Sequence, residues 1–64
     1  MTDNDGMEWL PVAEAALAVR VRESVIYGWR SRDTVRSHKI HGRVWVCMAD
    51  TMEAEHAWRI RVAA

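Results

Sequence analysis

The chain has 64 residues, with nine basic and nine acidic side chains, four tryptophans and one cysteine. This length allows a single domain, and one cysteine excludes an intramolecular disulfide and the Cys₂His₂ and Cys₄ zinc patterns. No apolar run approaches the roughly 20 residues that cross a bilayer, and the acidic N-terminus is unlike a signal peptide, so we expect a cytoplasmic protein without a membrane partner.

The zero net charge conceals an uneven distribution along the chain. Residues 1–19 carry four acidic and no basic side chains, whereas residues 20–43 carry seven basic and two acidic ones. A continuous basic block can present a positive face to a polyanion, although a solvated arginine-rich surface would have the same composition. Charge alone leaves both interpretations open.

The first expected elements are a tail and a helix. Residues 1–8 are polar, contain Gly6 and show no periodicity, so we expect a disordered tail there and one ordered domain over residues 9–62. A helix is predicted to begin at Pro11, because proline suits the first helical position. Its apolar stripe, with spacings of three and four residues, consists of Val12, Ala15, Ala16 and Val19.

A second, amphipathic helix is predicted after a very short connection. With about 100° of rotation per residue, one arc is wide enough to face a core and holds Val21, Val25, Ile26 and Trp29. The opposite arc holds Glu23, Ser24, Tyr27, Arg30 and Ser31. Two short helices joined in this way form a helix-turn-helix unit, whose second helix usually enters the major groove of DNA.

The rest of the chain predicts a hairpin and a third helix. Residues 37–46 alternate in the manner of strands, and His41-Gly42 marks a tight turn at the tip. Asp50 and Glu53 have the spacing of a capping box, with Asp50 as the N-cap. The helix that they open is expected to end near Arg61 and to bury Met52, Ala54 and Trp58.

In this order of helix, helix, hairpin and helix, several short motifs resemble those of a known group of DNA-binding domains. They are Leu10-Pro11-Val12-Ala13-Glu14-Ala15-Ala16, then Val21, then Val25-Ile26-Tyr27-Gly28-Trp29, the hairpin over residues 39–46, and Asp50. The chain thereby resembles the small winged helix-turn-helix domains of the MerR-like and phage excisionase group. The resemblance implies a mainly α fold with a small β-hairpin as the wing.

Two residues depart from the pattern of that group. Arg20 stands where the group has a turn glycine, and Arg22 stands where it has an N-cap serine. A left-handed conformation at Arg20 would cost of the order of 1 kcal/mol. Loss of the serine cap would cost roughly 0.5–2 kcal/mol of helix stability. Because arginine is unfavourable for folding at these positions but favourable for phosphate binding, the departures point to function.

The resemblance also implies site residues for binding double-stranded DNA. Base-edge contacts would come from Ser24, Tyr27 and Arg30, with Arg30 as the best candidate for a bidentate guanine contact. Contacts with the DNA backbone, or from the wing with the minor groove, would come from Arg20, Arg22, Ser31, Arg36, Lys39, His41 and Arg43. For any single arginine, a solvated surface position remains an equal alternative.

The resemblance and the short chain favour one biological role. We expect a phage excisionase, a recombination directionality factor that binds repeated sites cooperatively, bends DNA and directs an integrase toward excision. Residues 49–64 leave room for only one short helix, so we expect head-to-tail association with neighbours on DNA rather than a dimerisation arm. A small transcriptional regulator with the same module is the alternative. A DNA-packaging subunit and a protein-interaction module docking through the acidic N-terminal segment are further alternatives.

Other chemistry is weakly supported. The aromatic residues could form a stacking platform for single strands, but Trp29 and Trp58 fall on core-facing arcs. For Trp45, which strand alternation puts on the face opposite Val44 and Val46, burial and exposure on the wing both stay open. No pair of a nucleophile and a base is present, so we expect no enzyme and no cofactor. No tetrahedral metal pattern is formed by His38, His41, Cys47 and His56.

Overall fold

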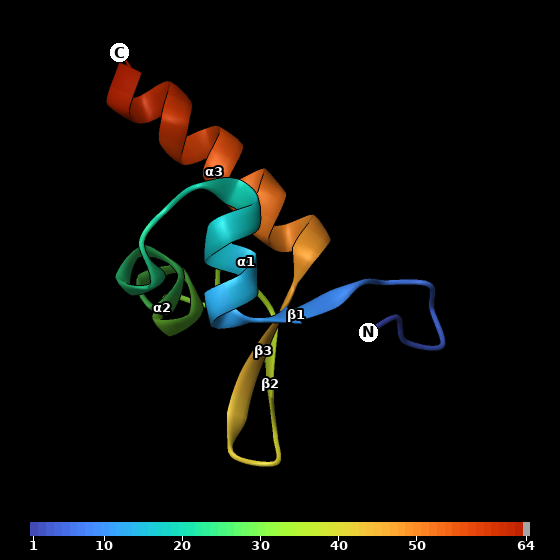
Figure 1. Cartoon of the computed structure of the whole chain (residues 1–64). Coiled ribbons are helices and arrows are strands. Elements are labelled where there is room, and N and C mark those ends of the chain that lie inside the picture. Colours follow the sequence, from blue (N-terminus) through green and yellow to red (C-terminus); the bar gives the residue numbers. More distant parts are fainter. Residues whose placement is uncertain (64) are drawn as a thin grey trace.

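The computed structural model describes residues 1–63 and places the side chains of residues 1–62. Three helices and a three-stranded antiparallel sheet alternate along the chain (Figure 1). The elements are β1 (Trp9–Pro11), α1 (Val12–Val19), α2 (Glu23–Ser31), β2 (Ser37–Ile40), β3 (Arg43–Cys47) and α3 (Met48–Ala63). The tip of the β2–β3 hairpin and the far end of α3 lie at opposite ends of the molecule (Figure 1).

Both of the predicted short helices and the predicted hairpin are confirmed, but β1 is a strand that the sequence analysis did not predict. β1 pairs with β3, opposite the β2 edge, so the sheet order is β1-β3-β2. Three residues are too few to show strand alternation, and Pro11 argues against a strand in general. At an edge the missing N–H of Pro11 is tolerated. Pro11 is also the N-cap residue of α1, so the helix begins one residue later than predicted.

Residues 1–8 take a defined course, which differs from the expected disordered tail. The Asp3 side chain accepts hydrogen bonds from the N–H groups of Asp5 and Met7, both at 2.9 Å, and Gly6 has a φ of 79°. This is a turn built on an aspartate side chain and a glycine. The indole of Trp9 donates to Asp3 at 2.7 Å, which fixes the turn against β1.

The core lies between the sheet and the helices. Ala15 of α1, Ile26 of α2 and Val46 of β3 have no exposed surface, and Trp29 keeps only 4% of its surface exposed. The remaining buried members of the cluster are Val12, Ala16, Val35, Met48 and Ala54. The predicted core-facing arc of α2 is therefore confirmed, since Val21 and Val25 also pack against this cluster while remaining partly exposed.

The predicted start of α3 is wrong, and so is the predicted burial of two of its three residues. The chain passes from β3 into α3 without a loop, so Asp50 lies within the first turn and is not an N-cap. The N–H of Met48 instead donates to the carbonyl of Glu8 at 2.9 Å. Ala54 is buried as predicted, but Met52 is 59% exposed and Trp58 is 38% exposed. Trp58 lines a hollow together with Trp29, Arg32 and Thr34.

Candidate nucleic-acid interface

α2 presents a polar outer face that matches the predicted arc. Ile26 and Trp29 hold the helix against the core, which fixes its rotation. The outer residues Glu23, Ser24, Tyr27, Arg30 and Ser31 are all exposed. Gly28 lies beside this face, where an added Cβ would meet only the guanidinium of Arg32, at 3.8 Å. The outer face of α2 is therefore free for contact with another molecule.

The turn before α2 carries two arginines in unusual backbone positions. Arg20 ends α1 in the left-handed conformation, with φ 59° and ψ 48°, as the comparison with the turn glycine implied. Its N–H and that of Val21 both point to the carbonyl of Ala16, which closes the helix. Arg22 is the N-cap of α2 and provides no side-chain cap. Both arginine side chains are exposed beside the positive end of α2.

The hairpin forms as predicted around His41 and Gly42. Their φ angles of 50° and 78° are those of the tight turn whose twist matches two strands. In the register of β2 and β3, Lys39 lies opposite Val44, and Ile40 lies opposite Arg43. Because cross-strand partners share a face of the sheet, Lys39 and Arg43 lie on opposite faces of the hairpin. The exposed His41 lies between them at the tip.

A shared hollow and one hydrogen bond relate α2 to the hairpin. Near the start of α2, Glu23 and Tyr27 line a hollow of about 240 Å³ together with Gly42 and Arg43 of the hairpin tip. Near the end of α2, the Nε of Arg30 donates to the hydroxyl of Ser37 at 2.9 Å. The outer face of α2 and the hairpin therefore lie on the same side of the molecule. We call the exposed residues of these two elements the α2–hairpin surface: Arg22, Glu23, Ser24, Tyr27, Arg30, Ser31, Lys39, His41 and Arg43.

Arg36 does not join this surface, contrary to the role expected for it. Its guanidinium forms two hydrogen bonds with Asp50, at 2.7 and 3.2 Å, and its N–H donates to the same carboxylate at 3.1 Å. The guanidinium also contacts the sulfur of Cys47 at 3.7 Å. These hydrogen bonds raise the pKa of Arg36 and lower the pKa of Asp50. Arg36 therefore fastens the base of β2 to the start of α3.

The charge of the α2–hairpin surface comes from a subset of the basic block. Within the part of the chain that the structure describes, the ion pairs are Arg36–Asp50 and Arg59–Glu55. Arg20, Arg22, Arg30, Lys39 and Arg43 are thus exposed cations on or beside this surface. The single carboxylate on it is that of Glu23. Sequence analysis missed Ser37, because its hydrogen bond to Arg30 is a tertiary contact with no local signal.

Over residues 1–63, no three His, Cys, Asp or Glu side chains gather in a way that would hold a metal ion. Cys47 is fully buried, and His38 stacks at 4.7 Å against the ring of Trp9. In the same described range, no helix has the length and apolar character needed to cross a membrane.

Comparison with family models, with curated proteins and with solved structures finds no match for this chain. A function for this chain is therefore inferred from the geometry and charge of the α2–hairpin surface.

Proposed function

We propose that this protein binds double-stranded DNA as a winged helix-turn-helix domain. In this proposal α2 enters the major groove, and the β2–β3 hairpin is the wing on the neighbouring backbone or minor groove. The observation that carries the proposal is that the outer face of α2 and the hairpin lie on one side of the molecule, with a shared hollow near the start of the helix and a hydrogen bond from Arg30 to Ser37 near its end. Three helices and a three-stranded antiparallel sheet are compatible with this fold.

The chemistry of α2 suits base reading. The hydrogen bond from Nε of Arg30 to Ser37 leaves both terminal nitrogens of the guanidinium available and restricts its rotation. Those two nitrogens can donate together to the O6 and N7 atoms of guanine. The hydroxyl groups of Ser24 and Tyr27 supply further donors and acceptors on the same exposed face. In this arrangement Ser37 positions Arg30 without touching DNA.

The chemistry around α2 suits phosphate binding. Arg22 provides no cap for the first N–H groups of the helix, so a phosphate placed there would accept from those groups and pair with the arginine. Lys39 and Arg43 lie on opposite faces of the hairpin, so a wing set edge-on against the duplex would direct both toward phosphates. Phosphate contacts of this kind set orientation and affinity but carry no base sequence.

Within this function we propose the role of an excisionase that directs an integrase, and the resemblance noted above supports that role. Cooperative head-to-tail association on DNA and bending of the duplex belong to the same proposal. A small transcriptional regulator would use the same surface. The two roles predict different binding sites, so footprinting separates them. Direct repeats near an attachment site would support excision, whereas one operator over a promoter would favour regulation.

The binding proposal itself is tested by the affinity of the full chain for short duplexes that contain one selected site or a random sequence. We expect Arg30→Ala to reduce the preference for the selected site, and Arg43→Ala to weaken binding to both duplexes alike. Arg61→Ala is the matched control, because Arg61 lies near the far end of α3. If both surface variants bound each duplex like the unmodified chain, the proposed interface would be wrong.

A further inference from the structure

A single carboxylate lies among the cations of the α2–hairpin surface. Glu23 is exposed in the first turn of α2, and it lines the hollow that Tyr27 shares with Gly42 and Arg43 of the hairpin tip. Its place is therefore on the side of α2 that faces the hairpin tip. A negative charge at this place opposes the approach of DNA phosphates, so its presence on a surface that binds DNA calls for a physical reason.

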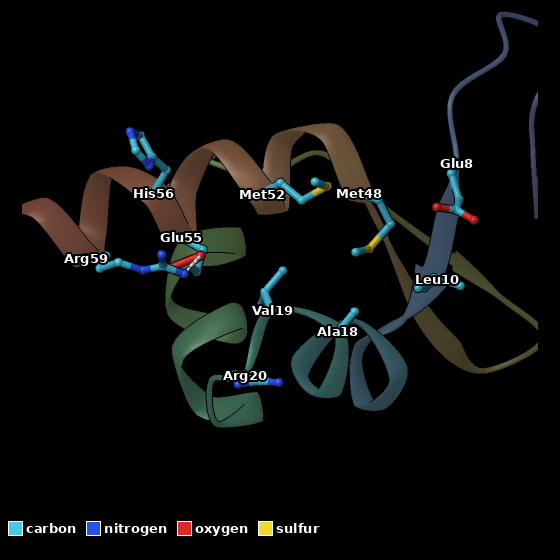
Figure 2. Close-up of a pocket in the computed structure, with 10 residues that line it drawn as sticks. All are labelled: Glu8, Leu10, Ala18, Val19, Arg20, Met48, Met52, Glu55, His56 and Arg59. Atoms are coloured by element: carbon cyan, nitrogen blue, oxygen red, sulfur yellow. Dashed lines mark hydrogen bonds and ion pairs between the residues drawn. The ribbon is translucent and has the colours of Figure 1, made fainter.

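Over residues 1–63, the fold gives this carboxylate no cationic partner. One ion pair of this range joins Arg36 to Asp50. The other, drawn in Figure 2, joins Arg59 to Glu55 across 2.7 Å on α3. Glu23 belongs to neither pair, so its oxygens stay open to a hydrogen-bond donor from another molecule.

The base edges in the major groove of DNA offer such a donor selectively. An ionised carboxylate only accepts hydrogen bonds, so it is repelled by an edge that carries only acceptors, as guanine does with N7 and O6. Thymine presents an acceptor and a methyl group, and adenine sets an acceptor beside its amino donor. Cytosine presents the N4 amino donor alone. A carboxylate in the major groove therefore selects cytosine.

The position of Glu23 on α2 suits a contact of this kind. In helix-turn-helix complexes the first residues of the recognition helix are among those that reach base edges. Glu23 and Arg30 are both exposed and lie on one stripe of α2, because seven residues are nearly two helical turns. About 10 Å separates the two positions along the helix axis, which equals about three base-pair steps of B-DNA. The two side chains can therefore meet base edges in one groove at a fixed separation.

We propose that Glu23 is a specificity-determining residue that accepts a hydrogen bond from N4 of a cytosine in the major groove. This cytosine lies about three base-pair steps from the guanine that Arg30 binds. The inference rests on the proposed DNA binding and adds to it two bases of the recognised site. In the alternative role, Glu23 only stabilises the positive end of α2, which requires its charge and no contact with a base.

The test compares the duplexes that the full chain and its variants select from a pool of random sequence, followed by titration of the selected duplexes. The unmodified chain should select cytosine and guanine at the proposed spacing, and replacement of that cytosine by another base should weaken binding roughly tenfold. Glu23→Gln should select adenine in place of cytosine, because an amide binds N6 and N7 of adenine together. The guanine should be retained, since Arg30 is unchanged.

Two further variants separate base reading from charge. Glu14→Gln is the matched control, because it removes the same charge from an exposed position of α1. It should select the same site as the unmodified chain. Glu23→Asp keeps the charge and shortens the side chain, so it should bind the cytosine site more weakly while its affinity for random duplexes stays unchanged. Circular dichroism of each variant checks that it is folded.

Three results would overturn the inference while DNA binding itself persists. The first is selection of one and the same site by Glu23→Gln and the unmodified chain. The second is tighter binding of Glu23→Gln to all duplexes alike, which would leave Glu23 with a repulsive effect only. The third is undiminished binding of Glu23→Asp to the cytosine site. If the unmodified chain bound no duplex at low salt, the proposed function would fail, and this inference would fail with it.

Discussion

Arg20 and Arg22 occupy two backbone positions where other residues would favour folding. Arg20 has a left-handed φ of 59°, and Arg22 leaves the N-terminus of α2 without a side-chain cap. We expect Arg20→Gly combined with Arg22→Ser to raise the free energy of unfolding by about 1–2 kcal/mol, through relief of strain and a new cap. Urea denaturation measures this change. The same double variant should bind DNA more weakly, because two cations beside α2 are lost.

A glycine at Arg32 provides the control for this prediction. Arg32 ends α2 with a φ of −95°, which any residue adopts, so Arg32→Gly relieves no strain. It should lower the free energy of unfolding slightly, because glycine loses more backbone entropy on folding. If Arg20→Gly and Arg22→Ser stabilised the protein without weakening DNA binding, the two arginines would have no binding role.

The indole groups of Trp9 and Trp45 differ in hydrogen bonding, although both lie in the sheet. The Trp9 indole donates to Asp3 at 2.7 Å, whereas in the described structure that of Trp45 is buried with no acceptor. Trp9→Phe should lower the free energy of unfolding, since it removes a hydrogen bond to a carboxylate. Trp45→Phe should be nearly neutral, because it removes an unsatisfied donor. Thermal and urea unfolding of both variants would show whether this difference exists.

At the scale of elements, the contact between Arg36 and Asp50 makes the packing of α3 sensitive to acid. The hydrogen bonds from Arg36 lower the pKa of Asp50 from its ordinary value of 3.8, so the folded state favours the ionised carboxylate. The stabilisation is therefore complete above that ordinary pKa and is lost as the pH falls through the lowered pKa. We expect the free energy of unfolding to fall on acidification below about pH 4.

The variant Asp50→Asn tests this dependence, because an amide cannot titrate. Its free energy of unfolding should be lower than that of the unmodified protein at neutral pH, and it should fall less on acidification. Asp3 also has a lowered pKa, owing first to its hydrogen bond with Trp9, so some acid sensitivity will remain. Glu14→Gln, on the exposed side of α1, serves as the control. If the free energy of unfolding fell equally on acidification in all three proteins, ionised Asp50 would not stabilise the fold through Arg36.

Long periodic segments of the sequence predict their elements correctly, and short or boundary segments do not. α2 and the hairpin are recognisable because an apolar stripe and a strand alternation each extend over many residues around a clear turn signal. β1 has three residues and contains Pro11, so it has no such pattern. Asp50 and Glu53 imitate a helix start, but the helix already begins at Met48, whose N–H donates to the carbonyl of Glu8.

The candidate interface was also predictable in part: its exposed faces follow from local sequence patterns, and its tertiary contacts do not. The exposed arc of α2 follows from the core-facing residues of the same helix, and the hairpin tip follows from its turn residues. The partner of Arg36 was not predictable, because Asp50 is fourteen residues away and the contact depends on how β2 meets α3. The hydrogen bond between Arg30 and Ser37 is likewise a product of the tertiary fold. Local sequence patterns predict which residues are exposed. Contacts between side chains that are far apart in the sequence can be identified only in the folded structure.

For the whole molecule, the relevant quantity is the number of cations that can reach DNA together. The sequence places seven basic residues in one block, but the structure turns Arg36 toward Asp50 and places Arg32 in a hollow with Trp58 and Arg61. The five that remain on or beside the α2–hairpin surface are Arg20, Arg22, Arg30, Lys39 and Arg43. Because Arg30 is assigned to a base edge, the other four cations on phosphates would give a slope of about −3 to −4 for the logarithm of affinity against the logarithm of salt concentration.

Two variants with the same change of charge show which basic residues reach DNA. They distinguish the whole basic block of the sequence from the subset that lies on or beside the α2–hairpin surface. Arg43→Gln removes a cation of the hairpin tip, so the salt slope should become shallower by about one. Arg36→Gln removes a cation already paired with Asp50, so the slope should stay unchanged even if the protein becomes less stable. Fluorescence anisotropy with a short duplex between low and moderate salt measures both. If the two variants changed the slope equally, Arg36 would reach DNA and the boundary drawn around the α2–hairpin surface would be wrong.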